Sequence, residues 1–206
     1  MAFQSIWYFT DLPNEIITSI ENDLTSNFES NMETSMLSGQ NLDTKKRKSK
    51  NAWIPTSHWT SGYIWHYVEK ANRENFLYDI TSIDGESMQF TRYSEGEFYG
   101  WHNDTGLTTL EKPQFDGKNS TLLKNDFINK NTELVRKLSF VLQLSDPEDY
   151  EGGNLQLLDE NEKCYFAPRA RGSLIVFDSR TKHRVLKVTK GVRKSLVGWV
   201  VGPRWK

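Results

Sequence analysis

Apolar residues follow two different spacings along the chain, and the change falls near residue 80. Before it, they recur every three or four positions in Ile16–Leu24 and again in about Thr60–Phe76, which is the spacing of one buried helix face. The segment Asp11–Pro13 can cap and start the first helix, because proline is tolerated in a first helical turn. Residues 1–80 are therefore expected to form a helical support region.

After Leu77 the chain changes to short apolar or alternating runs separated by turns that contain glycine. We expect strands in Ser87–Tyr93, Lys137–Leu144, Asn154–Leu158, Ser173–Phe177, Arg184–Val188 and Lys194–Val201. The pattern predicts a mainly β (α+β) fold, in which a sandwich or jelly roll over residues 87–201 carries the N-terminal helices on one sheet. A chain of 206 residues is expected to form one domain.

Composition excludes several classes of protein. The formal net charge of −1 provides no overall field that would attract nucleic acid or an anionic membrane. The single cysteine, Cys164, can form neither an internal disulfide nor a cysteine-rich zinc module. No run approaches the roughly 20 apolar residues that span a bilayer, and the first residues lack the basic start of a secretory signal. These features predict a cytoplasmic protein without a membrane segment.

Two histidines and one aspartate are the candidate metal ligands. His102 and Asp104 stand two residues apart, so on a strand both side chains point to the same face. His183 comes much later, directly after an apolar strand and a polar turn. Two histidines and one carboxylate on one face of an octahedron leave three positions free, which suits non-haem iron(II). Taken singly, the pair fits a surface turn and His183 fits a structural role; the combination is what indicates a metal site.

Arg193 adds a second element to this site. It lies ten residues after His183, and its guanidinium can bind a carboxylate through two parallel hydrogen bonds. If a hairpin turn at Thr189–Gly191 joins their strands, both residues face one cavity. Arg193 can then hold the far carboxylate of a dicarboxylate whose other end chelates the metal. Ser195 faces the same side of its strand and could donate its hydroxyl; a surface charge is the alternative for Arg193.

Four motifs, in order, resemble the prolyl 4-hydroxylase type of iron(II)- and 2-oxoglutarate-dependent oxygenases. They are Arg92-Tyr93-Ser94-x-Gly96-x-x-Tyr99-x-x-His102-x-Asp104; Arg136-x-Leu138-Ser139 with Glu151-Gly152-Gly153-x-Leu155; Gly172-Ser173-Leu174-x-Val176-Phe177-x-Ser179-x-x-x-His183-x-Val185; and Val188-x-x-Gly191-x-Arg193-x-Ser195-Leu196-x-x-Trp199. The match covers roughly residues 87–201. Upstream, Arg47-x-Ser49-x-x-x-Trp53 resembles a segment often found before the core in these proteins.

The resemblance implies a double-stranded β-helix with the site between two sheets. It implies that His102, Asp104 and His183 bind iron(II), and that 2-oxoglutarate is held by Arg193, Tyr93 and Ser195. The implied reaction uses dioxygen to hydroxylate an unactivated C–H bond and releases succinate and carbon dioxide, with ascorbate as an auxiliary reductant. We expect 4-hydroxylation of a prolyl residue in a peptide or protein.

The substrate has several alternatives. Nucleic-acid demethylases of the same superfamily tend to carry a second arginine six residues after the co-substrate arginine, and Trp199 stands there instead, which disfavours a nucleic acid. Another amino-acid residue or a small molecule stays open, as do a non-catalytic binding module and a hydrolase or isomerase with a different metal. The basic run 45–50 is expected to be a solvated loop, and the segment 107–131, which does not align with the family, a long loop.

Overall fold

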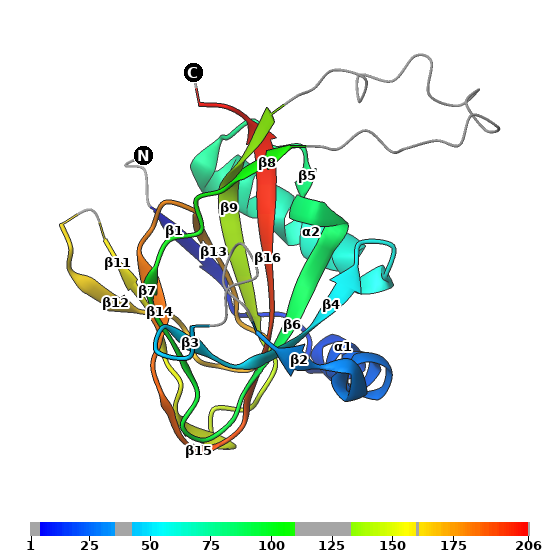
Figure 1. Cartoon of the computed structure of the whole chain (residues 1–206). Coiled ribbons are helices and arrows are strands. Elements are labelled where there is room, and N and C mark those ends of the chain that lie inside the picture. Colours follow the sequence, from blue (N-terminus) through cyan, green and yellow to red (C-terminus); the bar gives the residue numbers. More distant parts are fainter. Residues whose placement is uncertain (1–4, 36–42, 110–132, 160, 206) are drawn as a thin grey trace.

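The computed structural model describes residues 5–35, 43–109, 133–159 and 161–205 (Figure 1). Two antiparallel β-sheets face each other, and helices α1 (Asn14–Phe28) and α2 (Trp59–Ala71) cover the outer face of the larger sheet. The fold is thus the mainly β jelly roll with helices on one sheet that the sequence predicts. No helix in these ranges has the length and apolar character needed to cross a bilayer.

Within the described residues, the larger sheet has nine strands and the smaller one has five. The larger sheet runs in the order β1 (Ile6–Phe9), β13 (Leu174–Asp178), β9 (Glu133–Gln143), β16 (Arg193–Pro203), β6 (Ser87–Tyr93), β4 (Lys50–Pro55) and β2 (Glu33–Thr34), with β5 (Ser82–Ile83) on β16 and β8 (Leu107–Thr109) on β9. The smaller sheet runs in the order β12 (Cys164–Phe166), β11 (Leu155–Leu158), β14 (His183–Val185), β7 (Phe98–His102) and β3 (Arg47–Lys48). A separate pair joins β10 (Tyr150–Gly152) to β15 (Val188–Gly191).

Residue parity separates the two faces of the larger sheet. In β6, β9, β13 and β16, even-numbered residues such as Phe90, Phe140 and Leu196 face the helices, where they pack with Ile17 of α1 and Ile64 of α2 in one buried apolar cluster. The odd-numbered residues of these strands face the smaller sheet, because successive side chains of a strand point to opposite faces. The register between β9 and β16 shifts at Val200–Val201, and beyond that shift the even-numbered Arg136 lines the cavity instead. One face therefore forms the core and the other is available for a site.

The two helices begin in different ways. Pro13, the last residue of the segment predicted to cap and start the first helix, stands at the N-cap of α1, and no side chain caps that end. His58 is the N-cap of α2, and its Nδ1 accepts a hydrogen bond from the backbone N–H of Thr60. A π-helical turn, Asn72–Phe76, extends α2 to the predicted end, and short 3₁₀ turns occupy Glu29–Asn31 and Asp84–Glu86.

The N-terminal region contributes strands as well as helices. β1 pairs with β13 and β4 pairs with β6, so both extend the larger sheet. The basic run 45–50 is only partly a solvated loop, since β3 and the start of β4 fall inside it. Alternation along this extended segment buries Arg47 and Ser49 and leaves Lys48 and Lys50 exposed. The charge of Arg47 is therefore enclosed, contrary to expectation.

The structure differs from two further expectations, one about the turn at Thr189–Gly191 and one about the segment 107–131. The hairpin at Thr189–Gly191 is wrong: β15 pairs with β10, and β16 then enters the larger sheet. His183 and Arg193 consequently lie in opposite sheets, across a cavity. The segment 107–131, predicted to be a loop, begins with strand β8 on the edge of β9, and residues 110–132 lie outside the described residues.

Candidate metal and dicarboxylate site

The three predicted metal ligands come together between the sheets. β7 ends at His102 and β14 begins at His183, and these two residues pair across the smaller sheet. Asp104 follows β7, and its backbone N–H donates to the Ser179 carbonyl at 2.9 Å. One donor atom from each of the three side chains lies within 4.8 Å of the others. Among the described residues, this is the one such group of three His, Cys, Asp or Glu side chains.

Each histidine is oriented by a hydrogen bond at Nδ1. That atom lies 2.8 Å from the Gly100 carbonyl in His102 and 2.9 Å from the Thr181 carbonyl in His183. Because a carbonyl only accepts, each Nδ1 carries the proton and each Nε2 presents its lone pair. The two Nε2 atoms lie 3.7 Å and 3.4 Å from the carboxylate oxygens of Asp104. Three lone-pair donors therefore border the same small volume.

The charge state of this cluster suits a divalent metal. Burial, followed by the neighbouring His183, lowers the pKa of His102 to about 4. Burial opposes ionisation of Asp104, but the two histidines and a 2.7 Å hydrogen bond from Ser139 Oγ hold the pKa of its carboxyl below the ordinary value. At neutral pH the site thus offers a neutral His102 imidazole beside a carboxylate, the forms in which these groups bind metals.

Arg193 faces this cluster from the larger sheet with 1% of its surface exposed. Its Nη2 donates to Gln143 Oε1 at 2.9 Å, its Nη1 reaches Ser195 Oγ at 3.4 Å, and its Nε has no partner. No carboxylate of the described residues forms an ion pair with it. A buried cation without a counter-charge is strongly unfavourable, so this guanidinium suits a bound anion. A carboxylate is the anion whose two oxygens match its fork.

Tyr93 and Ser195, the other predicted co-substrate residues, line the same cavity. Tyr93 pairs with Arg193 across β6 and β16, and its ring centroid lies 5.6 Å from the guanidinium carbon. Ser195 is fully buried and shares the face of Arg193. The cavity, of about 790 Å³, is also lined by His102, Asp104 and His183. All six predicted residues thus meet in one place, while their roles toward iron and 2-oxoglutarate stay predictions.

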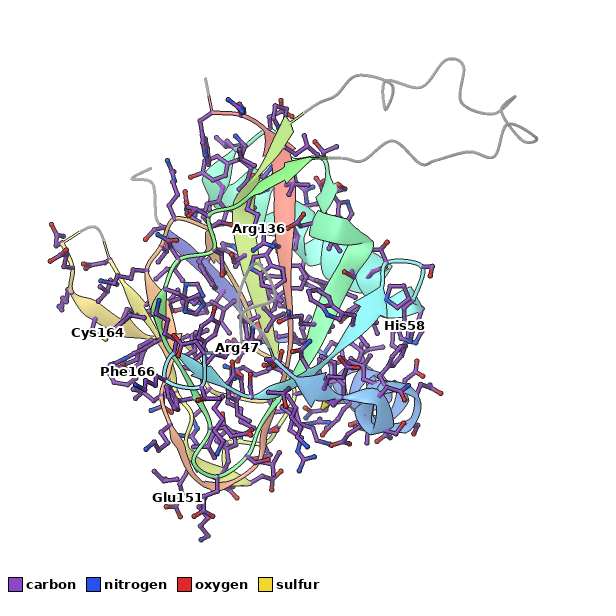
Figure 2. The ribbon with its side chains drawn as sticks, viewed as in Figure 1. Arg47, His58, Arg136, Glu151, Cys164 and Phe166 are labelled. Carbon is purple, nitrogen blue, oxygen red and sulfur yellow. The ribbon has the colours of Figure 1, made fainter. Side chains whose placement is uncertain are left out.

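Several cavity residues escaped the sequence analysis as site residues, among them Arg47, Arg136 and Trp53. Their shared signal is a polar or aromatic residue at an alternating strand position, which by itself also fits a solvent-facing strand. Figure 2 shows Arg47 and Arg136 toward the middle of the molecule, whereas Cys164 lies on the outer strand β12. Arg136 is held by Asp84, whose carboxylate accepts from its Nε at 2.6 Å.

Comparison with known proteins gives the family. Residues 88–201 match the sequence model of the 2OG-Fe(II) oxygenase superfamily. The chain belongs to this superfamily. The matched region runs from β6 into β16 and includes the histidine–aspartate cluster and Arg193. A 2OG-Fe(II) oxygenase is expected to hold iron and 2-oxoglutarate, and the lone-pair donors and the unpaired guanidinium described above fit both groups.

Relatives and solved structures point the same way. A PKHD-type hydroxylase from Synechococcus sp. (strain JA-2-3B'a(2-13)) is 36% identical over 153 residues, which make up 73% of this oxygenase and 59% of that relative. A prolyl-4-hydroxylase from Pseudomonas putida superposes with a TM-score of 0.67 and 19% identity, over 98% of this chain and 94% of that one. A Trichoplax adhaerens prolyl hydroxylase, in complex with a hypoxia inducible factor peptide fragment, superposes with a TM-score of 0.71 and 17% identity, over 96% of this chain and 84% of that one. The two structural matches show the fold.

Proposed function

We propose that this oxygenase uses iron(II) and 2-oxoglutarate to hydroxylate an unactivated C–H bond, with release of succinate and carbon dioxide. The observation that carries the proposal is the pairing, in one cavity, of His102, Asp104 and His183 with the unpaired cation of Arg193. A metal alone would leave the guanidinium without an anion, and an anion alone would leave three converging donors without a metal. A chelating dicarboxylate satisfies both.

Each residue has a defined task in this proposal. Bound iron with 2-oxoglutarate activates dioxygen for attack on a C–H bond. The histidines hold the metal through Nε2, with the rings kept in place by the backbone carbonyls at Nδ1. Arg193 receives the far carboxylate of 2-oxoglutarate, and the hydroxyls of Tyr93 and Ser195 can donate to the same carboxylate. Apolar side chains on the facing strands, among them Val141 and Leu155, line part of the cavity and would keep water out of it.

For the substrate, we propose a peptide or protein with 4-hydroxylation of a prolyl residue. The cavity exceeds what 2-oxoglutarate alone would fill, and Trp53 lines it with 54% of its surface exposed. The ring centroids of Trp53 and Trp199 are 6.4 Å apart, and the exposed Trp53 ring offers an aromatic surface to an apolar ring of the substrate. The names of the similar proteins, prolyl hydroxylases among them, support the same class. A reducing compartment such as the cytoplasm suits this activity because it maintains iron(II).

The test is a coupled assay with purified protein, iron(II), ascorbate and a panel of proline-containing peptides. Succinate should form, and mass spectrometry should detect a peptide gain of one oxygen at proline. His102→Ala should abolish both products, while His66→Ala, which removes an exposed histidine on α2, should leave them unchanged. Succinate without any oxidised peptide would retain the oxygenase and reject the prolyl substrate. No succinate under any condition would reject the enzyme proposal.

A further inference from the structure

Arg47 is a second guanidinium that lines the cavity. It lies in β3, at the inner edge of the smaller sheet, and pairs with Tyr99 of β7. Figure 2 shows it toward the middle of the molecule. Only 7% of its surface is exposed, although the flanking Lys46 and Lys48 are open to solvent. A charge in this position needs a reason beyond solubility.

The partners of Arg47 are all neutral. Its Nε donates to Ser49 Oγ at 3.0 Å and its Nη2 donates to Gln89 Oε1 at 3.2 Å. Its guanidinium carbon lies 4.8 Å from the ring centroid of Tyr99. Within the described part of the chain, Nη1 has no hydrogen-bond partner and no carboxylate forms an ion pair with the side chain. Arg136, in the same cavity, differs because Asp84 neutralises it.

Arg47 also lies close to the candidate metal cluster. The Tyr99 ring, which contacts the Arg47 guanidinium, stacks on the His102 ring with centroids 3.5 Å apart. On the other side, Asn51 and Trp53 of β4 and the exposed Glu33 of β2 line the cavity. An anion on Arg47 would therefore lie in the same cavity as the metal cluster and the exposed Trp53.

Electrostatics decides which anion this can be. Removing a cation from water is costly unless an opposite charge meets it, and neutral oxygens compensate only in part. Arg193 already provides for the far carboxylate of 2-oxoglutarate from the larger sheet, while the near end of that molecule would chelate the metal. The co-substrate thus leaves Arg47 unpaired, so the second anion has to come with the substrate.

We propose that Arg47 binds a carboxylate of the peptide substrate, so that the enzyme selects a target residue close to an acidic side chain or to the C-terminal carboxylate. The inference rests on the proposed function and adds a rule for substrate choice. The hydrogen bonds to Ser49 and Gln89 keep the guanidinium in place before the substrate arrives.

The first experiment needs no variant. Wild-type enzyme is assayed on peptides with a central proline that differ only in Glu or Gln at one neighbouring position, and on peptides that end in a free acid or an amide. At one position at least, the acid should lower KM by about 10- to 100-fold relative to the amide, the range of a charge-assisted hydrogen bond. The arm that shows the preference identifies a side chain or a chain end as the source. Equal KM values across every pair would overturn the proposal.

The second experiment assigns the preference to Arg47. Arg47→Gln should remove the acid-over-amide ratio, while Arg47→Lys should retain part of it. Lys48→Gln is the matched control, because it removes a positive charge from the next, exposed residue of β3 and should keep the full ratio. A full ratio in Arg47→Gln would overturn the assignment. Peptide affinity, measured by tryptophan fluorescence with manganese(II) in place of iron, should change in parallel.

Two readouts separate this inference from the function on which it rests. Succinate formation without peptide reports the metal and co-substrate sites and should be equal in wild type and Lys48→Gln. If wild type forms no succinate, the proposed function fails; if it hydroxylates peptides without an acid preference, only the inference about Arg47 fails. Inhibition by a short oligonucleotide that depends on Arg47, with no Glu–Gln difference among peptides, would replace the peptide carboxylate by a phosphate and overturn the proposal.

Discussion

Replacing Arg193 by methionine should have opposite effects on the free protein and on co-substrate binding. The substitution removes the cation and keeps a long, flexible apolar side chain in its place. In the free protein it relieves a buried charge that no described carboxylate neutralises. In the liganded protein it removes the group that we assign to the far carboxylate of 2-oxoglutarate. Replacement of an ordinary core residue would only lower the stability of the free protein.

The magnitude follows from the contacts of Arg193. The 2.9 Å hydrogen bond to Gln143 is lost, at about 1.5–3 kcal/mol for a charged donor. The desolvation penalty of an unpaired buried ion, which is several kcal/mol, is relieved. The metal-free variant should therefore unfold with a free energy within about 1 kcal/mol of wild type, or above it. Arg171→Met is the matched control, because Arg171 is paired with Glu21 at 2.8 Å and donates to the Leu144 carbonyl, so its loss should destabilise.

Thermal unfolding followed by circular dichroism measures both effects. With manganese(II) and no oxygen, 2-oxoglutarate at 100 times its Kd should stabilise wild type by about 2.7 kcal/mol. For a chain of this size that raises Tm by roughly 5–10 °C. Arg193→Met should show no such rise, whereas Arg171→Met should show all of it. If metal-free Arg193→Met loses more than about 3 kcal/mol, the guanidinium is satisfied in the free fold and the electrostatic reasoning is refuted.

Three further predictions concern metal binding, the protonation of His102 and the packing of the core. His102→Ala should lose stoichiometric iron(II) in metal analysis after gel filtration, while His66→Ala retains it; iron in both would contradict the ligand assignment. The free energy of unfolding of the metal-free protein should fall between pH 6.5 and about 4, because the unfolded chain protonates His102 there and the folded chain, in which burial lowers that pKa to about 4, does not. Urea titrations should show a shallower fall in His102→Ala, and an unchanged slope would rule out this cause. Gly198→Ala should cost about 1–3 kcal/mol, since its Cβ would overlap the Phe140 ring. Gly62→Ala, in open space on α2, should instead stabilise by about 0.5–1 kcal/mol, and two changes of the same sign would count against the packing argument.

The sequence predicts best where one spacing persists over several residues. Ser87–Tyr93 was expected as a strand and is β6 with the same bounds, and Lys194–Val201 falls inside β16. Apolar and polar residues alternate visibly in Ser87–Tyr93, because one side of that strand packs on helices. His102 and Asp104 also line the cavity together, although Asp104 lies beyond the end of β7 rather than on the strand. Local geometry alone determines the two strands, so a single sequence suffices to predict them.

Features that depend on a distant partner were missed or wrong. The turn at Thr189–Gly191 has the composition of a hairpin, but β15 pairs with β10, and no local signal names that partner. The burial of Arg47 was missed for the same reason. Within a basic run it looks like its neighbours, and only the pairing of β3 with β7 encloses it. The sequence shows that the segment is basic as a whole, whereas the burial of one of its residues depends on which strand pairs with it.

The division of the larger sheet by residue parity explains how such a cavity can persist. The helix-facing residues, such as Phe140 and Leu196, form a closed apolar core whose burial stabilises the fold independently of the site. The opposite face can therefore carry polar groups whose charges are unmatched until ligands bind. It follows that Phe140 contributes to stability alone, whereas stability and function are opposed at Arg47 and Arg193. At these two arginines, the unfavourable burial of each cation in the free protein becomes favourable binding when a carboxylate arrives.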